Sequence, residues 1–192
     1  MNKNKKTKSN IIEFCLVCRE DLWKDYIVSK KFPLYKYRYC RNCTFMQIYP
    51  IPSDKELSLI YDDAWSGSNN ATYNYYMNDN QNSYYTKTRN KILDEFDDIK
   101  SYFNSHSYEN LQVLEVGVGD GTFMDASKKY GFDCLGLDLS SVAVSRLRDK
   151  GYNVLLGDFC ENISELKIES FDIIHMSHTL EHFQDTNLAI SK

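Results

Sequence analysis

The sequence lacks the features that mark a membrane protein or a nucleic-acid binder. No apolar run in its 192 residues approaches the roughly 20 needed to cross a bilayer, and the N-terminus has no apolar signal segment. Lys and Arg number 23 against 27 Asp and Glu, so the formal net charge is −4. Nucleic acids and anionic membranes both favour a basic face. We therefore expect a cytoplasmic protein that binds neither a membrane nor a nucleic acid.

The six cysteines are unevenly placed. Cys15 and Cys18 form one Cys-x-x-Cys pair and Cys40 and Cys43 a second, with 21 residues between the pairs. Disulfides are rare in the cytosol, and four thiolates at this spacing can close a tetrahedral site of the kind that structural zinc needs. We predict a small zinc-ribbon-like module here. A redox disulfide is the alternative.

From residue 111 onward, short apolar runs alternate with helical patterns. Strands are expected at 111–116, 132–137, 152–156 and 171–176, and helices in the first two intervals. Such alternation with short connections indicates a parallel sheet with right-handed crossovers. The predicted fold class is therefore α/β, with a Rossmann-like sheet of about four strands. Ser53 and Glu56 form a capping box for an earlier helix, and a further helix is expected over 86–102.

Glycine and acidic residues gather where three of these strands end. The first strand runs into Glu115-Val-Gly117-Val-Gly119-Asp-Gly121, in which glycines permit a tight turn and close approach of a ligand. The second ends at Asp138, whose carboxylate can accept hydrogen bonds from both hydroxyls of a ribose. The third ends at Asp158 and Phe159, which could meet the amine and the face of an adenine. These residues together predict an adenosine site.

A dinucleotide site is the alternative interpretation of the glycine turn. Its fingerprint is Gly-x-Gly-x-x-Gly, with backbone amides facing a pyrophosphate. Here Thr122 stands where the third glycine should be, and Glu115 precedes the first glycine by two residues. A carboxylate suits a cationic sulfonium and an amino group better than a pyrophosphate.

These motifs, with Phe171-Asp172 and Leu180-Glu181-His182, resemble class I S-adenosylmethionine-dependent methyltransferases over residues 111–186. The resemblance implies that Glu115 and the glycine loop hold the methionine part of S-adenosylmethionine, Asp138 the ribose, and Asp158 with Phe159 the adenine.

Residues 15 to about 65 resemble the N-terminal region of a bacterial subgroup that includes sugar C-methyltransferases. This second resemblance implies a small-molecule acceptor such as a nucleotide-linked sugar. It also implies acid–base roles for His182, as the base, and for Glu181, which would orient it or act itself.

The sheet of that family has seven strands in the order 3-2-1-4-5-7-6, of which only four are expected here. We therefore expect an incomplete acceptor site and an exposed sheet edge, through which the chain could self-associate or pair with a missing C-terminal part. The alternative function is a catalytically inactive fragment that binds zinc and an adenosyl group. The expected organisation is a disordered tail (1–10), a zinc-binding module (11–52), a helical linker or lid (53–105) and the partial donor-binding domain (106–192).

Overall fold

The computed structural model describes residues 13–28, 35–66, 111–161, 166 and 170–192, together with five helical residues between 91 and 101. The chain divides into two compact units, one of Met1–Leu57 with Leu180–Lys192 and one of Ser58–Thr179. The expected tail, most of the expected linker or lid, and the apolar face of the helix expected over 86–102 lie outside the described residues. The expected domain boundaries stay a prediction.

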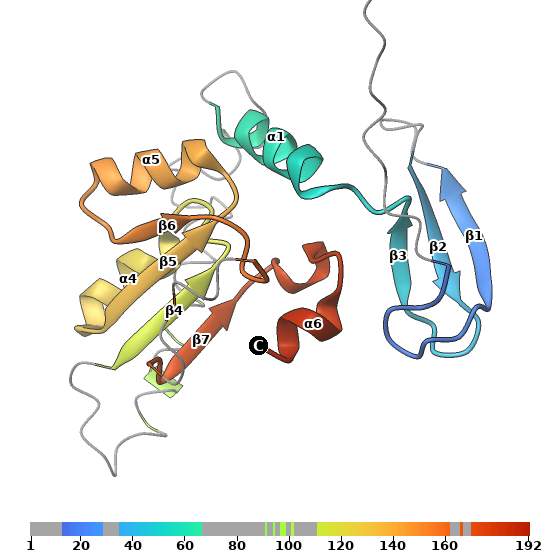
Figure 1. The fold of residues 1–192 in the computed structure, drawn as a ribbon. Coiled ribbons are helices and arrows are strands. Elements are labelled where there is room, and N and C mark those ends of the chain that lie inside the picture. Colours follow the sequence, from blue (N-terminus) through green and yellow to red (C-terminus); the bar gives the residue numbers. More distant parts are fainter. Residues whose placement is uncertain are drawn as a thin grey trace, which may run out of the picture. The chain divides into compact units, whose positions relative to one another are not determined.

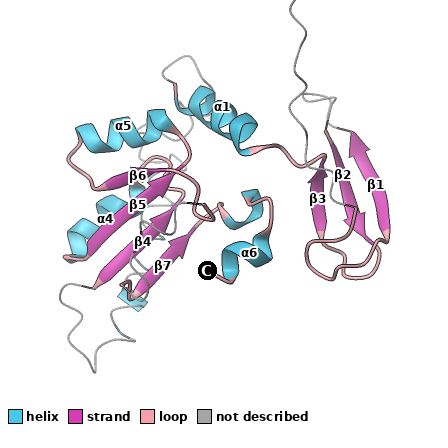
Figure 2. Ribbon diagram, in the orientation of Figure 1, coloured by secondary structure: helices cyan, strands magenta, loops and turns pink. Residues whose placement is uncertain are grey.

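The first unit contains a small antiparallel sheet (Figure 2). Its strands are β1 (Trp23–Val28), β2 (Lys36–Cys40) and β3 (Met46–Tyr49), in the order β1-β2-β3. Arg38, at the centre of β2, is buried, and its guanidinium carbon lies 4.0 Å from the ring centroids of both Trp23 and Tyr49. Cation–π contacts therefore stabilise a buried guanidinium group at the centre of this sheet.

The same unit includes the end of the described chain. A 3-10 turn, η2 (Leu180–His182), is followed by the short helix α6 (Thr186–Ile190). Helix α1 (Asp54–Trp65) begins in this unit and continues in the second. Its capping box is confirmed, because the Ser53 amide donates to Glu56 Oε2 at 2.9 Å and the Glu56 amide to Ser53 Oγ at 3.3 Å.

The second unit is a parallel four-stranded sheet with helices between its strands (Figure 1). The strands β4 (Gln112–Val116), β5 (Asp133–Asp138), β6 (Val154–Leu156) and β7 (Ile173–Met176) have the order β6-β5-β4-β7. The expected α/β class is confirmed, and this order is the 3-2-1-4 part of the family's sheet. Because the chain proceeds from β4 to one side and later returns to pair β7 on the other, the strand order reverses at β4. Ligands of open α/β sheets bind at the carboxyl ends of the strands beside such a reversal.

Two helices connect the first three strands and form the core with them. Helix α4 (Thr122–Tyr130) ends at Gly131, and helix α5 (Ser141–Asp149) begins after Ser140, whose hydroxyl accepts the Ala143 amide at 3.2 Å. The buried apolar residues of the core come from both helices and the strands: Val113, Val118, Phe123, Met124, Ala126, Phe132, Val144, Leu147 and Val154. This packing holds the strand ends, and thus the predicted site, at defined positions.

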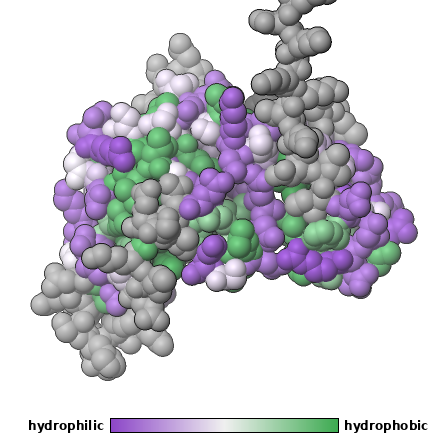
Figure 3. Space-filling model, viewed as in Figure 1, coloured by the Kyte–Doolittle hydropathy of each residue, from purple (hydrophilic) through white to green (hydrophobic). Residues whose placement is uncertain are grey.

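Some apolar side chains reach the surface, as the green atoms in Figure 3 show. Ile174, on the strand at one edge of the four-stranded sheet, is 55% exposed. Among the described residues, no helix combines the length and the apolar character that crossing a membrane requires.

Candidate functional site

The glycine loop between β4 and α4 has the backbone that its sequence predicts. Gly117, Gly119 and Gly121 have φ values of 81°, 50° and 88°, in the left-handed region that favours glycine. A Cβ atom on Gly117 would lie 2.3 Å from Thr179 Oγ1, and one on Gly121 would lie 2.4 Å from Leu147 Cδ2. The loop is therefore held close to the chain that leaves β7 on one side and to α5 on the other.

The three strand ends that carry the predicted residues lie side by side. Val116 pairs with Leu137, and Asp138 pairs with Leu156. The Gly117 amide also donates to Leu137 O at 2.8 Å, and the Gly157 amide to Asp138 O at 2.9 Å. The glycine loop, Asp138 and the turn after β6 thus meet at one edge of the sheet.

The carboxylate of Asp138 holds the glycine loop and the start of α5 together at this edge. Its Oδ2 accepts the Gly119 amide at 3.1 Å and its Oδ1 accepts the Ser140 amide at 2.8 Å. The Val118 amide also donates to this carboxylate. Since a carboxylate has about four acceptor positions, Asp138 can hold the loop and still accept a ligand hydroxyl. Burial raises the pKa of Asp138, although the backbone hydrogen bonds and nearby Arg146 lower it.

Glu115 is a buried acid with an unusual environment. Its side chain lies beside His175 on the neighbouring strand, with 3.9 Å between Oε1 and Nδ1, and His175 stacks on Phe123 at a centroid distance of 3.7 Å. Burial raises the pKa of Glu115 well above its usual value, as do the charges of nearby aspartates, and burial lowers the pKa of His175 to about 4. Glu115 Oε2 and His175 Nδ1 have no hydrogen-bond partner among the described residues. A buried polar atom without a partner is costly, and at a strand end it indicates a place for a ligand.

The remaining residues of the predicted adenine site have local roles in the structure. Asp158 Oδ1 accepts the amides of Cys160 at 2.6 Å and Glu161 at 3.1 Å, so it shapes the turn after β6. Phe159 is buried. Their contact with an adenine stays a prediction.

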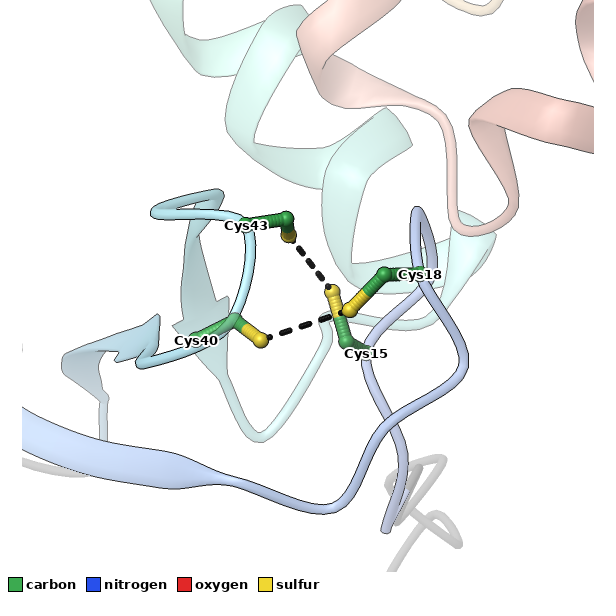
Figure 4. Close-up of side chains that lie close together, drawn as sticks. All are labelled: Cys15, Cys18, Cys40 and Cys43. Carbon is green, nitrogen blue, oxygen red and sulfur yellow. Dashed lines mark hydrogen bonds between the residues drawn. The ribbon is translucent and has the colours of Figure 1, made fainter.

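The four cysteines of the two Cys-x-x-Cys pairs lie together (Figure 4). Their Sγ atoms are all within 4.8 Å of one another, with 3.5 Å between Cys15 and Cys43 and between Cys18 and Cys40. A tetrahedral zinc site with Zn–S bonds of about 2.3 Å has S···S separations of about 3.8 Å, whereas a disulfide needs about 2.05 Å. Hydrogen bonds from the Asn42 side chain and the Glu20 backbone lower the pKa of Cys18 to about 6. The donor set therefore fits a closed metal site.

The candidate acid–base residues lie in η2, within the first unit. His182 Nε2 is 3.8 Å from Glu181 Oε1, and both side chains are exposed, at 43% and 58%. That distance permits a weak ion pair when the imidazole is protonated but no hydrogen bond. Exposed side chains of this kind are accessible to a substrate.

A comparison with protein families decides the class of this protein. A family model described as "Methyltransferase domain" matches residues 76–192, which is more than half of the chain. The chain belongs to this methyltransferase family. The family expected from the motifs is thus confirmed.

The methyltransferase chain is similar to a curated protein and to several solved structures. It is 30% identical over 89 residues to a ubiquinone biosynthesis O-methyltransferase of Bartonella quintana (strain Toulouse), a match that covers 44% of this chain and 36% of the relative. A SAM-dependent methyltransferase from Archaeoglobus fulgidus shows 23% identity over 55% of this chain and 49% of that chain, with a TM-score of 0.39. The plantazolicin methyltransferase BpumL in complex with SAH shows 18% identity over 72% and 54%, with a TM-score of 0.45. The chain spans about a third of the curated relative and about half of each structure.

The candidate site also includes residues of α1 that sequence reasoning missed. Asp62 accepts hydrogen bonds from the Ser140 hydroxyl at 2.8 Å, the Ser141 hydroxyl at 3.1 Å and the Val142 amide at 3.3 Å. This carboxylate thus caps the N-terminus of α5, where a negative charge is favourable. The only signal in the sequence was the capping box, which predicted a helix but not what it contacts.

One turn further along α1, Trp65 reaches the glycine loop. A Cβ atom on Gly119 would lie 3.3 Å from Trp65 Cζ2. Arg146 joins the two, because its guanidinium lies 5.0 Å from the Trp65 ring centroid and donates to Gly119 O at 2.7 Å. The indole of Trp65 therefore packs against the glycine loop, which is the proposed binding place of the donor.

A separate cavity of about 310 Å³ lies at the opposite edge of the sheet. Its lining includes Gln112 and Asp133, which begin β4 and β5, and Phe171 just before β7. These are the amino ends of the strands, whereas ligands of open α/β sheets bind at the carboxyl ends. We therefore place the candidate donor site at the glycine loop and not in this cavity.

Proposed function

We propose that this protein transfers a methyl group from S-adenosylmethionine to a small molecule. The observation that carries the proposal is the buried carboxyl group of Glu115, whose Oε2 has no hydrogen-bond partner among the described residues, beside a loop of three glycines with positive φ. Burial and the neighbouring carboxylates raise its pKa, so a cationic ligand would stabilise its ionised form. The donor carries both a sulfonium and an ammonium group, whereas a pyrophosphate would add negative charge to an acidic site.

In this proposal each strand end binds one part of the donor. Glu115 and the backbone of Gly117, Gly119 and Gly121 hold the methionine part, Asp138 the ribose, and Asp158 with Phe159 the adenine. The geometry supports the first two assignments most directly, because Glu115 is available for a cation and Asp138 retains acceptor capacity. Trp65 adds an aromatic wall above Gly119.

S-adenosylmethionine supplies a methyl group that is activated by the positive sulfur. The chain's own residues would align the acceptor with it, since in-line displacement depends strongly on positioning. His182 would remove the proton of the acceptor oxygen or carbon, with Glu181 orienting the imidazole or accepting the proton itself. A nucleotide-linked sugar is the acceptor that we propose, from the resemblance of the N-terminal region to sugar C-methyltransferases.

Zinc is the metal that we propose for Cys15, Cys18, Cys40 and Cys43. Four thiolates leave no open coordination position, so the metal would be structural. The sulfur separations support this assignment.

The second candidate is a module that binds the adenosyl group but does not transfer it. The decisive experiment titrates S-adenosylhomocysteine into the wild type and Asp138→Ala by isothermal titration calorimetry. Micromolar binding that the substitution abolishes supports the donor site, whereas silence in both contradicts it. Methyl transfer to candidate nucleotide sugars, followed with radiolabelled donor, then separates the enzyme from the module.

A further inference from the structure

The first cysteine pair and the C-terminal segment are connected within the first unit. The side-chain amide of Asn187 donates a hydrogen bond to the carbonyl of Leu16, which lies between Cys15 and Cys18. Leu16 is itself buried, at 3% exposed. A helix at the end of the described chain is thus bonded to the backbone of a metal-binding turn.

A second connection uses the residue that follows the cysteine pair. Arg19 Nη2 lies 3.9 Å from Asp185 Oδ2. The other oxygen of Asp185 caps α6, because it accepts the amides of Asn187 and Leu188, each at 3.1 Å. The Asp185 carboxylate therefore caps α6 and also connects it to the turn Cys15–Glu20, which we call the cysteine turn.

The C-terminal segment depends on such contacts for its conformation. Helix α6 has five residues, far fewer than the about 12 that an isolated helix needs in water. In the segment before it, the Gln184 side chain donates a hydrogen bond to Asp54 in the first turn of α1. Loss of the cysteine turn would therefore remove two of the three side-chain contacts named here.

The cysteine turn in turn depends on its metal. Arg19 has a φ of 65°, which is strained for a residue with a side chain, and the turn is closed by two backbone hydrogen bonds between Cys15 and the residues Arg19 and Glu20, both of 2.9 Å. Small modules of this kind commonly fold only with the metal bound. Zinc would hold the sulfur atoms of Cys15 and Cys18 and thereby the carbonyl of Leu16.

We infer that metal binding at the four cysteines orders the segment Leu180–Ile190 and so positions the turn that carries Glu181 and His182. The zinc module is then a positioning element for the acid–base residues. The chemical role of these two residues rests on the proposed methyl transfer, whereas the coupling between metal and segment rests on the proposed zinc site alone.

The coupling can be measured by hydrogen exchange on the full chain with zinc and after removal of zinc by a chelator. We expect amide exchange in peptides covering 180–192 to accelerate at least about tenfold without the metal, because local opening then becomes more frequent. Peptides covering 141–149, in α5 of the second unit, serve as the reference and should exchange at an unchanged rate. Equal protection of 180–192 in both states would overturn the inference, and so would loss of protection in both peptides.

The coupling can also be measured in the folded protein, through the affinity for zinc. If zinc stabilises the segment, the segment must strengthen zinc binding by the same factor. Asn187→Ala should weaken zinc affinity about 2- to 10-fold, the range expected for one hydrogen bond, in competition with a chromophoric chelator. Asn153→Ala removes an exposed amide of the second unit and is the matched control, with unchanged affinity.

If Asn187→Ala and the control bind zinc with equal affinity, the inferred coupling is contradicted. The proposed function fails in a different way, through absent binding of S-adenosylhomocysteine to the zinc-bound wild type, which neither exchange nor zinc affinity reports. The two failures are therefore distinguishable in one set of samples.

Discussion

Replacing Glu115 by Gln tests the donor site most directly, because the substitution keeps the shape of the side chain and removes its ability to ionise. Glu115 is 4% exposed, and its pKa is raised by burial and by the charges of Asp120, Asp138 and Asp125. An ammonium or sulfonium group beside it would favour the ionised form. Donor binding should therefore release a proton at pH values between the pKa that Glu115 has beside the donor and its raised pKa in the free protein.

The sign of the pH dependence follows from that proton. The ligand-free protein keeps Glu115 protonated up to the raised pKa, whereas the bound donor favours the carboxylate. Donor affinity should therefore rise with pH by at most about tenfold per pH unit for this group, from the pKa that Glu115 has beside the bound donor up to its raised pKa in the free protein. Folding stability has the opposite trend in this window, because the unfolded chain ionises first, and Glu115→Gln should remove both trends.

The size of the effect can be estimated from the charges involved. Two unit charges about 4 Å apart attract by about 4 kcal/mol at an effective dielectric constant of about 20. Ionising a carboxyl group of raised pKa costs about 1.4 kcal/mol for each pH unit between the assay pH and that pKa, and this cost reduces the attraction. A net contribution of about 1–3 kcal/mol corresponds to donor binding about 5- to 150-fold weaker in Glu115→Gln.

The assay compares two ligands by calorimetry at several pH values. S-adenosylhomocysteine contains the amino-acid part, and 5′-methylthioadenosine lacks it while keeping the ribose and adenine. We expect Glu115→Gln to weaken only the first ligand and Asp138→Ala to weaken both. Equal weakening of both ligands by Glu115→Gln, with an unchanged melting temperature, would refute the assignment of Glu115 to the methionine part.

Three further predictions concern the loop, its aromatic wall and the candidate base. Gly121→Ala should lower the melting temperature by several degrees more than Gly131→Ala, since both glycines have positive φ but only the first has a neighbour within 4 Å of the added methyl; equal losses in thermal melts would contradict this packing. In a Trp23→Phe background, the emission of Trp65 should change as S-adenosylhomocysteine is added, and an unchanged spectrum at saturation would remove Trp65 from the donor site. His182→Asn should lower kcat about 100- to 10,000-fold with the affinity for S-adenosylhomocysteine retained, and an unaltered kcat would exclude His182 as the base.

The site residues that could be predicted are those whose position follows from one strand and its neighbour. Each parallel strand ends at the same edge of the sheet, so an acid or glycine directly after an apolar run is placed without knowledge of distant contacts. Glu115, Gly117 and Asp138 were placed at this edge in this way, and the register of Val116 with Leu137 confirms the position but not the role.

The residues that could not be predicted depend on contacts between distant segments. Asp62 meets Ser140 across 78 positions, and nothing in the pattern of α1 indicates which helix end it caps. The three-stranded sheet could not be predicted from the sequence for another reason. Arg38 and Gln47, paired across β2 and β3, are polar but buried, so the usual alternation of apolar and polar residues is absent.

The division of the chain into two units leads to a last prediction about the metal. The residues proposed to hold the donor lie in Ser58–Thr179, whereas the cysteines share the other unit with Glu181 and His182. Removing zinc should therefore leave the affinity for S-adenosylhomocysteine within about twofold, since the core of α4, α5 and the sheet does not include the metal module. Methyl transfer should fall steeply, because the turn with the candidate base loses its anchors at Leu16 and Arg19. A chelated protein that loses donor binding together with transfer would show that the metal supports the whole chain and not this turn in particular.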